Sequence, residues 1–138
     1  MIRAAFFDLD GTLLTSEKKI NPSAREAILE AKKKGVKIFF ASARSPRLDQ
    51  TLGWTKQDFD LFDGAIYANG ACVQFEGREE YSLIDERAVR ATVCAVSEFE
   101  DVHISLHTPH EGYAFNFPPD DSMESGWGLS GARNASVR

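Results

Sequence analysis

The sequence contains few of the residues that would mark a secreted or membrane protein. It has only two cysteines in 138 residues, Cys72 and Cys94, so it cannot form a framework of several disulfides. Both lie in apolar runs and are expected to be buried thiols, which suits a reducing compartment. No apolar run approaches the ~20 residues of a membrane span, and the first residues lack the apolar core of a signal peptide. We therefore expect a cytoplasmic protein without membrane contact.

Positive charge is also scarce. Lysine and arginine together number 16 against 21 acidic residues, which gives a net charge of −5 and an isoelectric point near 5.2. This balance excludes the basic surface typical of nucleic-acid-binding proteins. The single lysine run, residues 32–34, is explained as the solvated end of a helix, where positive charge is favourable. The hydrophobic content of 43% is ordinary for one soluble globular domain.

The main chemical signal follows an apolar run over residues 4–7, which is succeeded by Asp8-Leu9-Asp10-Gly11-Thr12. The run is typical of a parallel strand buried on both faces, and ligands bind at the carboxyl ends of such strands. If strand alternation continues, Asp8 and Asp10 point the same way. Close carboxylates favour a divalent cation, and Mg²⁺ suits them. One could then act as a nucleophile and the other could transfer protons. A strand end followed by an Asx turn is the alternative.

A strand–helix–strand unit comes next. Asn21-Pro22 is typical of a helix start and Gly35 of a helix end. The apolar run over residues 36–41 then predicts a second strand, parallel to the first. A second helix is expected over residues 46–56.

Polar residues follow the second and third predicted strands directly. Ser42-Ala43-Arg44 offers a small hydroxyl before a helix, which suits a phosphate oxygen. A simple helix cap is the alternative for Ser42. Asn69-Gly70 follows a third apolar run, residues 65–68, and is also a strong signal for a plain turn.

Together these segments resemble a known family. Residues 8–14, Asp-Leu-Asp-Gly-Thr-Leu-Leu, resemble the first signature of the haloacid dehalogenase (HAD) phosphatase superfamily, and the order of the chain resembles its Cof-like branch. The resemblance implies an α/β fold with a three-layer, Rossmann-like core around a parallel sheet. It also implies Mg²⁺-dependent hydrolysis of a small phosphorylated metabolite, such as a sugar phosphate, through an aspartyl-phosphate.

The resemblance assigns roles residue by residue. It implies that Asp8 is the nucleophile and that Asp10 protonates the leaving alcohol and then activates water. Asp8 and Asp10 would hold Mg²⁺, Asp10 through its backbone carbonyl. The residues implied in phosphate or substrate contact are Leu9, Ser42, Ala43, Arg44 and Asn69. The family usually has Thr-Gly-Arg where this chain has Ser42-Ala43-Arg44. Serine keeps the hydroxyl, but the methyl group of Ala43 can crowd the approach of phosphate to the backbone.

The second half of the chain changes pattern. A hairpin is predicted over residues 72–83, an amphipathic helix over 85–100, and strands over 102–107 and 112–117. This order predicts a second, α+β unit and resembles the start of the Cof-like cap domain. We therefore expect three parts: a core over residues 1–71, a partial α+β cap over 72–117, and a disordered or unrelated tail over 118–138.

Two further patterns are better explained without a ligand. His103 and His107 are four apart on a predicted strand, hence ~13 Å from each other, which is too far to share one metal ion, and a metal site at these residues and His110 is not expected. Residues 126–131 spell Gly-x-Gly-x-x-Gly, but no strand precedes them, so they do not predict a dinucleotide site.

The family pattern also includes a later lysine and a Gly-Asp carboxylate cluster, and the sequence contains no Gly-Asp dipeptide. We therefore expect the chain to correspond to the first half of a family member, with little activity of its own. The outer edge of the first strand would be open, which favours self-association. A non-catalytic phosphate-binding or regulatory module, or an inactive fragment, remains the alternative function.

Overall fold

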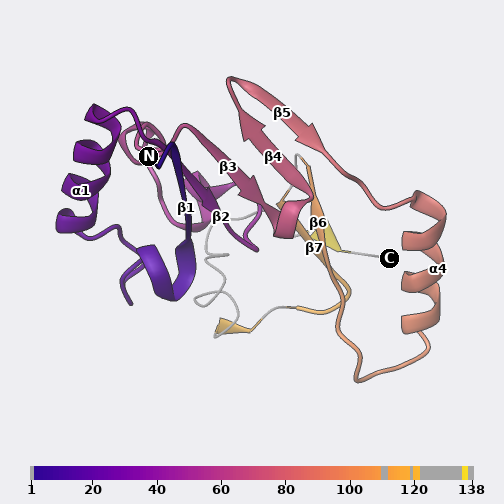
Figure 1. Cartoon of the computed structure of the whole chain (residues 1–138). Helices are drawn as coiled ribbons and strands as arrows, with labels where there is room; N and C mark the ends of the chain where they lie inside the picture. The colour runs from indigo at the N-terminus through magenta and orange to yellow at the C-terminus, as the bar shows by residue number, and fades with distance from the viewer. Residues whose placement is uncertain (1, 110–111, 119, 122–134, 137–138) are drawn as a thin grey trace.

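The computed structural model describes residues 2–109, 112–118, 120–121 and 135–136, which form two sheets with helices (Figure 1). The first sheet has the order β1-β2-β3-β4-β5. Its strands are β1 (Ala4–Asp8), β2 (Lys37–Ala41), β3 (Gly64–Tyr67), β4 (Cys72–Phe75) and β5 (Arg78–Tyr81). The second sheet consists of β6 (Ser105–Thr108), β7 (Gly112–Phe115) and β8 (Ala135–Ser136). No helix among the described residues is long and apolar enough to cross a membrane.

The first sheet confirms the predicted α/β fold class. β1 pairs with β2 and β2 with β3 in parallel, and the β4–β5 hairpin extends the sheet in antiparallel fashion. Glu76 and Gly77, both with positive φ, form the turn of this hairpin. The domain division at residue 71 stays a prediction, although the hairpin that follows it belongs to the sheet of the first part.

The helices of the first part agree with the sequence only in part. α1 (Pro22–Lys33) begins as predicted, because the Asn21 side chain accepts a hydrogen bond from the Ser23 backbone N–H at 3.1 Å. The helix predicted over residues 46–56 is wrong. Two single turns replace it, α2 (Leu48–Thr51) and α3 (Lys56–Phe59). Gly53 lies between them with φ +66°, a conformation that ends a helix, and Thr55 starts α3 through a capping box.

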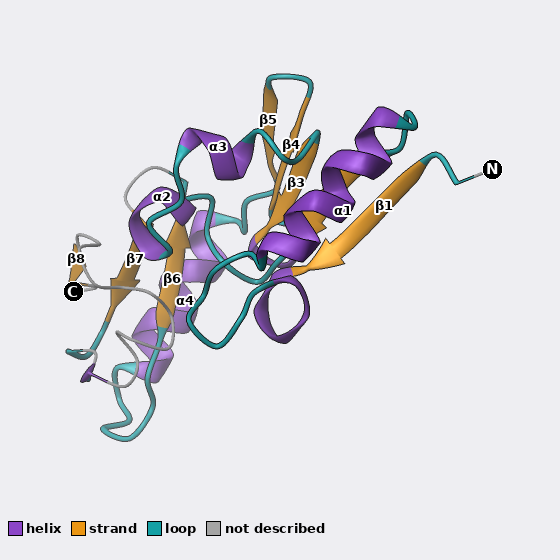
Figure 2. Ribbon diagram, turned by 90° about the vertical axis from the view of Figure 1, so that its left-hand side faces the viewer, coloured by secondary structure: helices purple, strands orange, loops and turns teal. Residues whose placement is uncertain are grey.

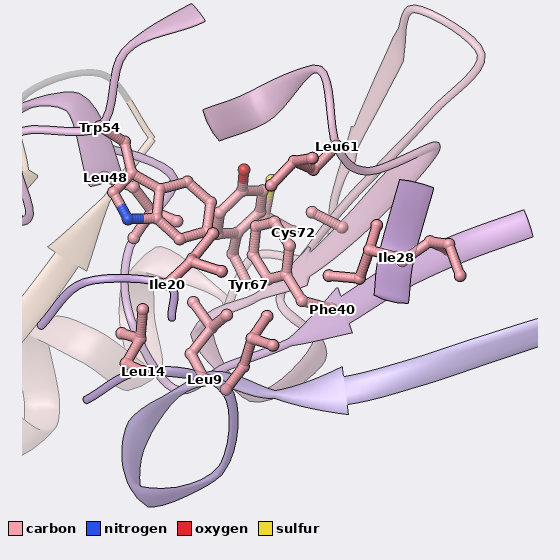
Figure 3. Packing of buried hydrophobic residues seen from close by; sticks show 13 residues of the cluster. Leu9, Leu14, Ile20, Ile28, Phe40, Leu48, Trp54, Leu61, Tyr67 and Cys72 are labelled. Carbon is pink, nitrogen blue, oxygen red and sulfur yellow. The ribbon is translucent and has the colours of Figure 1, made fainter. Parts of the chain in front are cut away.

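The hydrophobic core covers one face of the first sheet. α1 lies across this face, as Figure 2 shows. Phe40 lies in the core near Trp54 and Tyr67 (Figure 3), and it makes edge-to-face contacts with the rings of Trp54, Phe62 and Tyr67. Phe40 and Tyr67 are both only 1% exposed. The apolar run of β2 therefore supplies the centre of the core.

The opposite face of the sheet carries a row of aromatic rings, which we call the aromatic row: Phe6 on β1, Phe39 on β2 and Phe75 on β4. Phe6 stacks on Phe39 with centroids 4.7 Å apart, and Phe39 lies 5.6 Å from Phe75. Phe6 is 59% exposed. The prediction that the first strand is buried on both faces is therefore wrong. The predicted open edge is confirmed for the described residues, since among them β1 pairs only with β2.

The second half forms α4 (Glu86–Val96) and the second sheet. Asp85 caps α4 by accepting a hydrogen bond from the Arg87 backbone N–H at 2.8 Å. Cys94 on this helix is exposed, so the prediction of two buried thiols holds for Cys72 alone. The predicted tail lies mostly outside the described residues, as does the Gly-rich stretch over residues 126–131. Within the tail, Ala135–Ser136 pairs in parallel with β7.

Candidate active site

The first three strands bring the predicted site residues together at their carboxyl ends. Asp8 ends β1, Ser42 follows β2, and Asn69 follows β3. The Ser42 backbone N–H donates to the Ile66 carbonyl at 2.8 Å, and the Asn69 N–H donates to the Ser42 carbonyl at 3.2 Å. Parallel pairing thus joins three segments that are far apart in the sequence.

The segment after β1 departs from the predicted alternation. The strand ends at Asp8, and Leu9–Leu13 forms a wide helical turn closed by a hydrogen bond from the Leu14 N–H to the Leu9 carbonyl at 2.9 Å. Gly11 permits this turn with φ +77°. The Leu9 side chain is fully buried in the core, so only its backbone can contact a ligand. Because the strand does not continue, Asp8 and Asp10 are not alternate residues of one strand face.

Asp10 is held by two cations. The Arg44 side chain forms a bidentate pair with it, through Nε to Oδ2 at 2.7 Å and Nη2 to Oδ1 at 2.9 Å. The Lys18 ammonium lies 2.9 Å from Oδ1. The hydrogen bond from Arg44, opposed by partial burial and aided by Lys18, lowers the pKa of Asp10 from its ordinary 3.8 to about 2. Asp10 is therefore a carboxylate at neutral pH.

Asn69 adopts the turn that its sequence suggested as the alternative, whereas Ser42 caps no helix, because the next helix, α2, begins only at Leu48. The Ser42 hydroxyl oxygen accepts a hydrogen bond from the Arg44 backbone N–H at 3.1 Å, and the residue is buried. Asn69 has a left-handed φ of +54° and lies in the turn after β3. The Ala68 N–H donates to the Arg44 carbonyl at 2.8 Å. These bonds fix the loops after β2 and β3 to each other.

Two adjoining hollows lie over these loops. The first, which we call the Asp8 hollow, has a volume of about 400 Å³ and is lined by Asp8, Ser42 and Gly70 among others. The second, the Asp10 hollow, has a volume of about 460 Å³. It is lined by Asp10, Lys18, Arg44, His107 and Tyr113. Ala43 and Asn69 line both hollows, so the two spaces share one wall.

Sequence reasoning missed three residues of the Asp10 hollow. Lys18 belongs to a polar loop, and no sequence pattern distinguishes it from the polar residues beside it. His107 and Tyr113 face each other across β6 and β7, with their rings 4.5 Å apart edge to face. The Tyr113 phenol oxygen accepts a hydrogen bond from the Ser45 backbone N–H at 3.4 Å, which ties the hairpin to the loop of Arg44. Partial burial lowers the pKa of His107, so its imidazole is neutral at pH 7.

The described part of the chain offers oxygen ligands for Mg²⁺ but no complete set of carboxylates around one position. Among the described residues, no group of three or more His, Cys, Asp or Glu could hold a metal ion. His103 stacks on Phe117 with centroids 4.0 Å apart, and His110 lies outside the described residues. Mg²⁺ is commonly bound by one or two carboxylates together with water and substrate phosphate. The Asp8 carboxylate fits that role, whereas the Asp10 carboxylate is already bound by Arg44 and Lys18.

Removing the Arg44 guanidinium is expected to raise the pKa of Asp10. In an Arg44→Met variant the pKa should rise from about 2 toward 3.8, because the bidentate hydrogen bond is the largest cause of the shift. A carboxyl group whose pKa is lower in the folded protein than in the unfolded chain stabilises the fold at pH values above its unfolded pKa, near 4. This stabilisation is lost as the pH falls from about 4 through 2. The variant should lose less stability over that interval. Carbon-detected NMR titration of the carboxyl group measures the pKa directly.

Arg47→Met is the matched control, since Arg47 pairs with Asp49 at 3.6 Å on the surface and does not line the Asp10 hollow. It should leave the Asp10 titration unchanged. An Asp10 pKa that stays near 2 in Arg44→Met would assign the shift to Lys18 instead.

Comparison with known proteins identifies the family. A family model described as haloacid dehalogenase-like hydrolase matches residues 5–128. The chain belongs to the haloacid dehalogenase-like hydrolases. A Bacillus subtilis (strain 168) protein named "Putative phosphatase YkrA" is 34% identical over 86 residues, which are 62% of this chain and 32% of that protein. The range that the family model matches includes Asp8, Asp10, the residues that line both hollows and part of the predicted tail.

Solved structures of HAD proteins share the fold. The HAD subclass IIB sugar phosphatase BT4131 superposes with a TM-score of 0.74 at 28% identity over 98% of this chain and 52% of its own. BT1666 from Bacteroides thetaiotaomicron, described among phosphatases of the HAD superfamily, gives a TM-score of 0.71 at 26% identity over 100% of this chain and 50% of its own. The chain thus spans about half the length of these relatives.

Proposed function

We propose that this HAD-family chain carries the nucleophile half of a Mg²⁺-dependent phosphatase that acts on a small phosphorylated metabolite. The observation that supports this most directly is the convergence of Asp8, Ser42 and Asn69 at the ends of three adjacent strands, next to Asp10. BT4131, a structural neighbour, is a sugar phosphatase, which supports a phosphorylated small molecule as the substrate class.

The proposed reaction has two steps. In the first, a carboxylate oxygen of Asp8 bonds to phosphorus while the bond between phosphorus and the alcohol oxygen breaks, and Asp10 gives a proton to that oxygen. In the second, water attacks phosphorus, Asp10 takes its proton, and the bond to Asp8 breaks to release phosphate. Asp10 is ionised in its pairs with Arg44 and Lys18. The ionised form suits the second step, in which Asp10 accepts a proton. For the first step, the Asp10 carboxylate must leave Arg44 and Lys18 and take up a proton.

The other residues position the phosphoryl group. Ser42 and the backbone N–H groups of the neighbouring loops would hold its oxygens in the Asp8 hollow. When bound, Mg²⁺ would offset the negative charge of the phosphoryl group. The Asp8 carboxylate and the backbone carbonyl of Asp10 would hold the ion. The Asp10 side chain would serve in proton transfer and would not bind the ion.

One observation favours a second candidate, a phosphate-binding or regulatory module without turnover. The described residues that line the Asp8 hollow include Asp8 but no lysine or arginine. Phosphoryl transfer depends on neutralising charge at the transferring group. The described part of this chain supplies such charge only in the neighbouring hollow, through Lys18 and Arg44.

Capture of a phosphoryl mimic separates the two candidates. With Mg²⁺, beryllium fluoride should form a complex with the Asp8 carboxylate, detected as a bound ¹⁹F NMR signal, if Asp8 is placed as a nucleophile. Phosphate binding by calorimetry without any captured beryllium fluoride would favour the binding module. Absence of both would contradict both candidates.

A further inference from the structure

Lys18 lies in the turn of a short hairpin whose base is fixed to the core. Leu14 and Ile20 form an antiparallel bridge, and both are at most 9% exposed. Beyond this bridge, the Lys18 N–H donates to the Thr15 carbonyl at 2.9 Å, and the Thr15 N–H donates to the Lys19 carbonyl at 2.9 Å. The Lys18 backbone is left-handed, with φ +60°, which is unfavourable for a lysine. The hairpin therefore holds Lys18 in a conformation that it would rarely adopt in a free chain.

The two cations that bind Asp10 differ in how firmly they are held. The Arg44 side chain is only 8% exposed, and its backbone N–H and carbonyl are bound by Ser42 and Ala68. Arg44 also binds Asp10 through two nitrogen atoms. The Lys18 side chain is 40% exposed and reaches Asp10 through its ammonium alone. Lys18 is therefore the cation that can move, whereas Arg44 is fixed.

A phosphoryl group bound against Asp8 needs a cation that the Asp8 hollow does not supply. The described residues that line this hollow include no lysine or arginine, although charge neutralisation is central to phosphoryl transfer. In the proposed reaction, the leaving oxygen of the ester faces Asp10. The Lys18 ammonium, 2.9 Å from the Asp10 carboxylate, is then about two hydrogen-bond lengths from that oxygen. A flexible lysine side chain can cross this distance by rotating.

We propose that Lys18 is a mobile counter-ion, which pairs with Asp10 in the free protein and moves to an oxygen of the phosphoryl group when the ester binds. The move brings positive charge to the phosphoryl group from the neighbouring hollow. It also removes one of the two cations that hold the Asp10 carboxylate, so that this side chain can turn from Arg44 toward the leaving oxygen. The inference rests on the proposed function and adds to it the event that couples substrate binding to the release of Asp10.

Capture of beryllium fluoride with Mg²⁺, as a mimic of the phosphoryl group on Asp8, tests this exchange. Lys18→Met keeps an unbranched side chain but removes the charge, and it should weaken capture about tenfold, the effect of one charge-assisted hydrogen bond. Lys18→Arg should restore most of the affinity. Lys19→Met is the matched control, since this neighbouring lysine is exposed and lines neither hollow. It should change the affinity by less than about twofold in the same ¹⁹F NMR titration.

A double-mutant cycle distinguishes the exchange from a general effect of charge. If Asp10 and the phosphoryl group compete for Lys18, Asp10→Asn should tighten capture about fivefold, because the lysine is then available to the mimic. In the Lys18→Met background the same substitution should tighten capture by less than about twofold, since only the distant loss of one negative charge remains. The ¹³Cε NMR signal of Lys18, assigned by its absence in Lys18→Arg, should shift when the wild-type chain captures the mimic.

The failures are distinguishable. If the wild-type chain captures the mimic but the Lys18 signal does not shift and Lys18→Met binds equally well, Lys18 is a fixed partner of Asp10. The inference is then overturned and the proposed function stands. Equal tightening by Asp10→Asn in both backgrounds would also overturn the inference, because Lys18 would act through its charge without changing partner. If the wild-type chain captures no beryllium fluoride, both the inference and the proposed function are wrong.

Discussion

Phe40→Ala is expected to lower the free energy of unfolding by about 4 kcal/mol, in the range of large-to-small substitutions in protein cores. Phe40 is 1% exposed and contacts three aromatic rings at centroid distances of 4.8 to 5.5 Å. Removing its ring leaves a cavity among rigid neighbours that cannot collapse to fill it. Since small domains have only about 5–15 kcal/mol of stability, the variant should be largely unfolded under mild conditions. Urea denaturation followed by circular dichroism measures the loss.

Phe39→Ala is the matched control on the same strand. Phe39 points to the opposite face, where it stacks on the exposed Phe6. Its loss should cost only about 1 kcal/mol, the value of an aromatic pair at a partly solvated surface. Equal costs for the two variants would mean that both faces of the sheet are covered in solution, contrary to the one-sided core described above.

Asp8→Asn should abolish capture of beryllium fluoride, a loss of two orders of magnitude or more in affinity. An amide oxygen is a much weaker ligand than a carboxylate for both the beryllium centre and Mg²⁺, and asparagine changes the size of the side chain very little. The hydrogen bond from the Thr12 hydroxyl, 3.4 Å from Oδ2, can be kept by the amide oxygen. The fold should therefore survive, and the ¹⁹F signal of the bound complex is the readout.

Asp60→Asn is the control for this substitution. Asp60 is an exposed aspartate that pairs with Lys56 at 2.6 Å, outside both hollows. It should leave capture intact. Capture that persists in Asp8→Asn but disappears in Asp10→Asn would move the nucleophile to Asp10 and contradict the assignment that the family resemblance implied.

Local signals in the sequence predicted the parts of the fold that depend on nearby residues. Asn21-Pro22 located the start of α1, and the apolar runs located the parallel strands. The prediction of one helix over residues 46–56 was wrong because Gly53 ends the first turn and the capping box at Thr55 begins a new one, although Leu48 and Leu52 are spaced as in a helix. The prediction for Cys94 was wrong because the apolar face of an amphipathic helix is buried only where another part of the protein covers it, and no residue of α4 is buried.

The candidate site was predicted where strand topology alone brings residues together. Asp8, Ser42 and Asn69 each follow a strand, so parallel pairing was enough to place them side by side. Lys18 and His107 were missed because their positions depend on a loop conformation and on the approach of a second sheet. Such long-range contacts leave no periodic trace in the sequence.

The aromatic row has a consequence for the nucleophile. Successive even-numbered residues of β1 lie on the same side of the sheet, so Phe6 and Asp8 share that side and both are exposed. A polypeptide that shields the rings of Phe6, Phe39 and Phe75 from water would therefore also border the space around Asp8. Burial of the aromatic row and completion of the Asp8 hollow would then occur in the same association step. The free energy of that association would therefore also determine how completely the surroundings of Asp8 are formed.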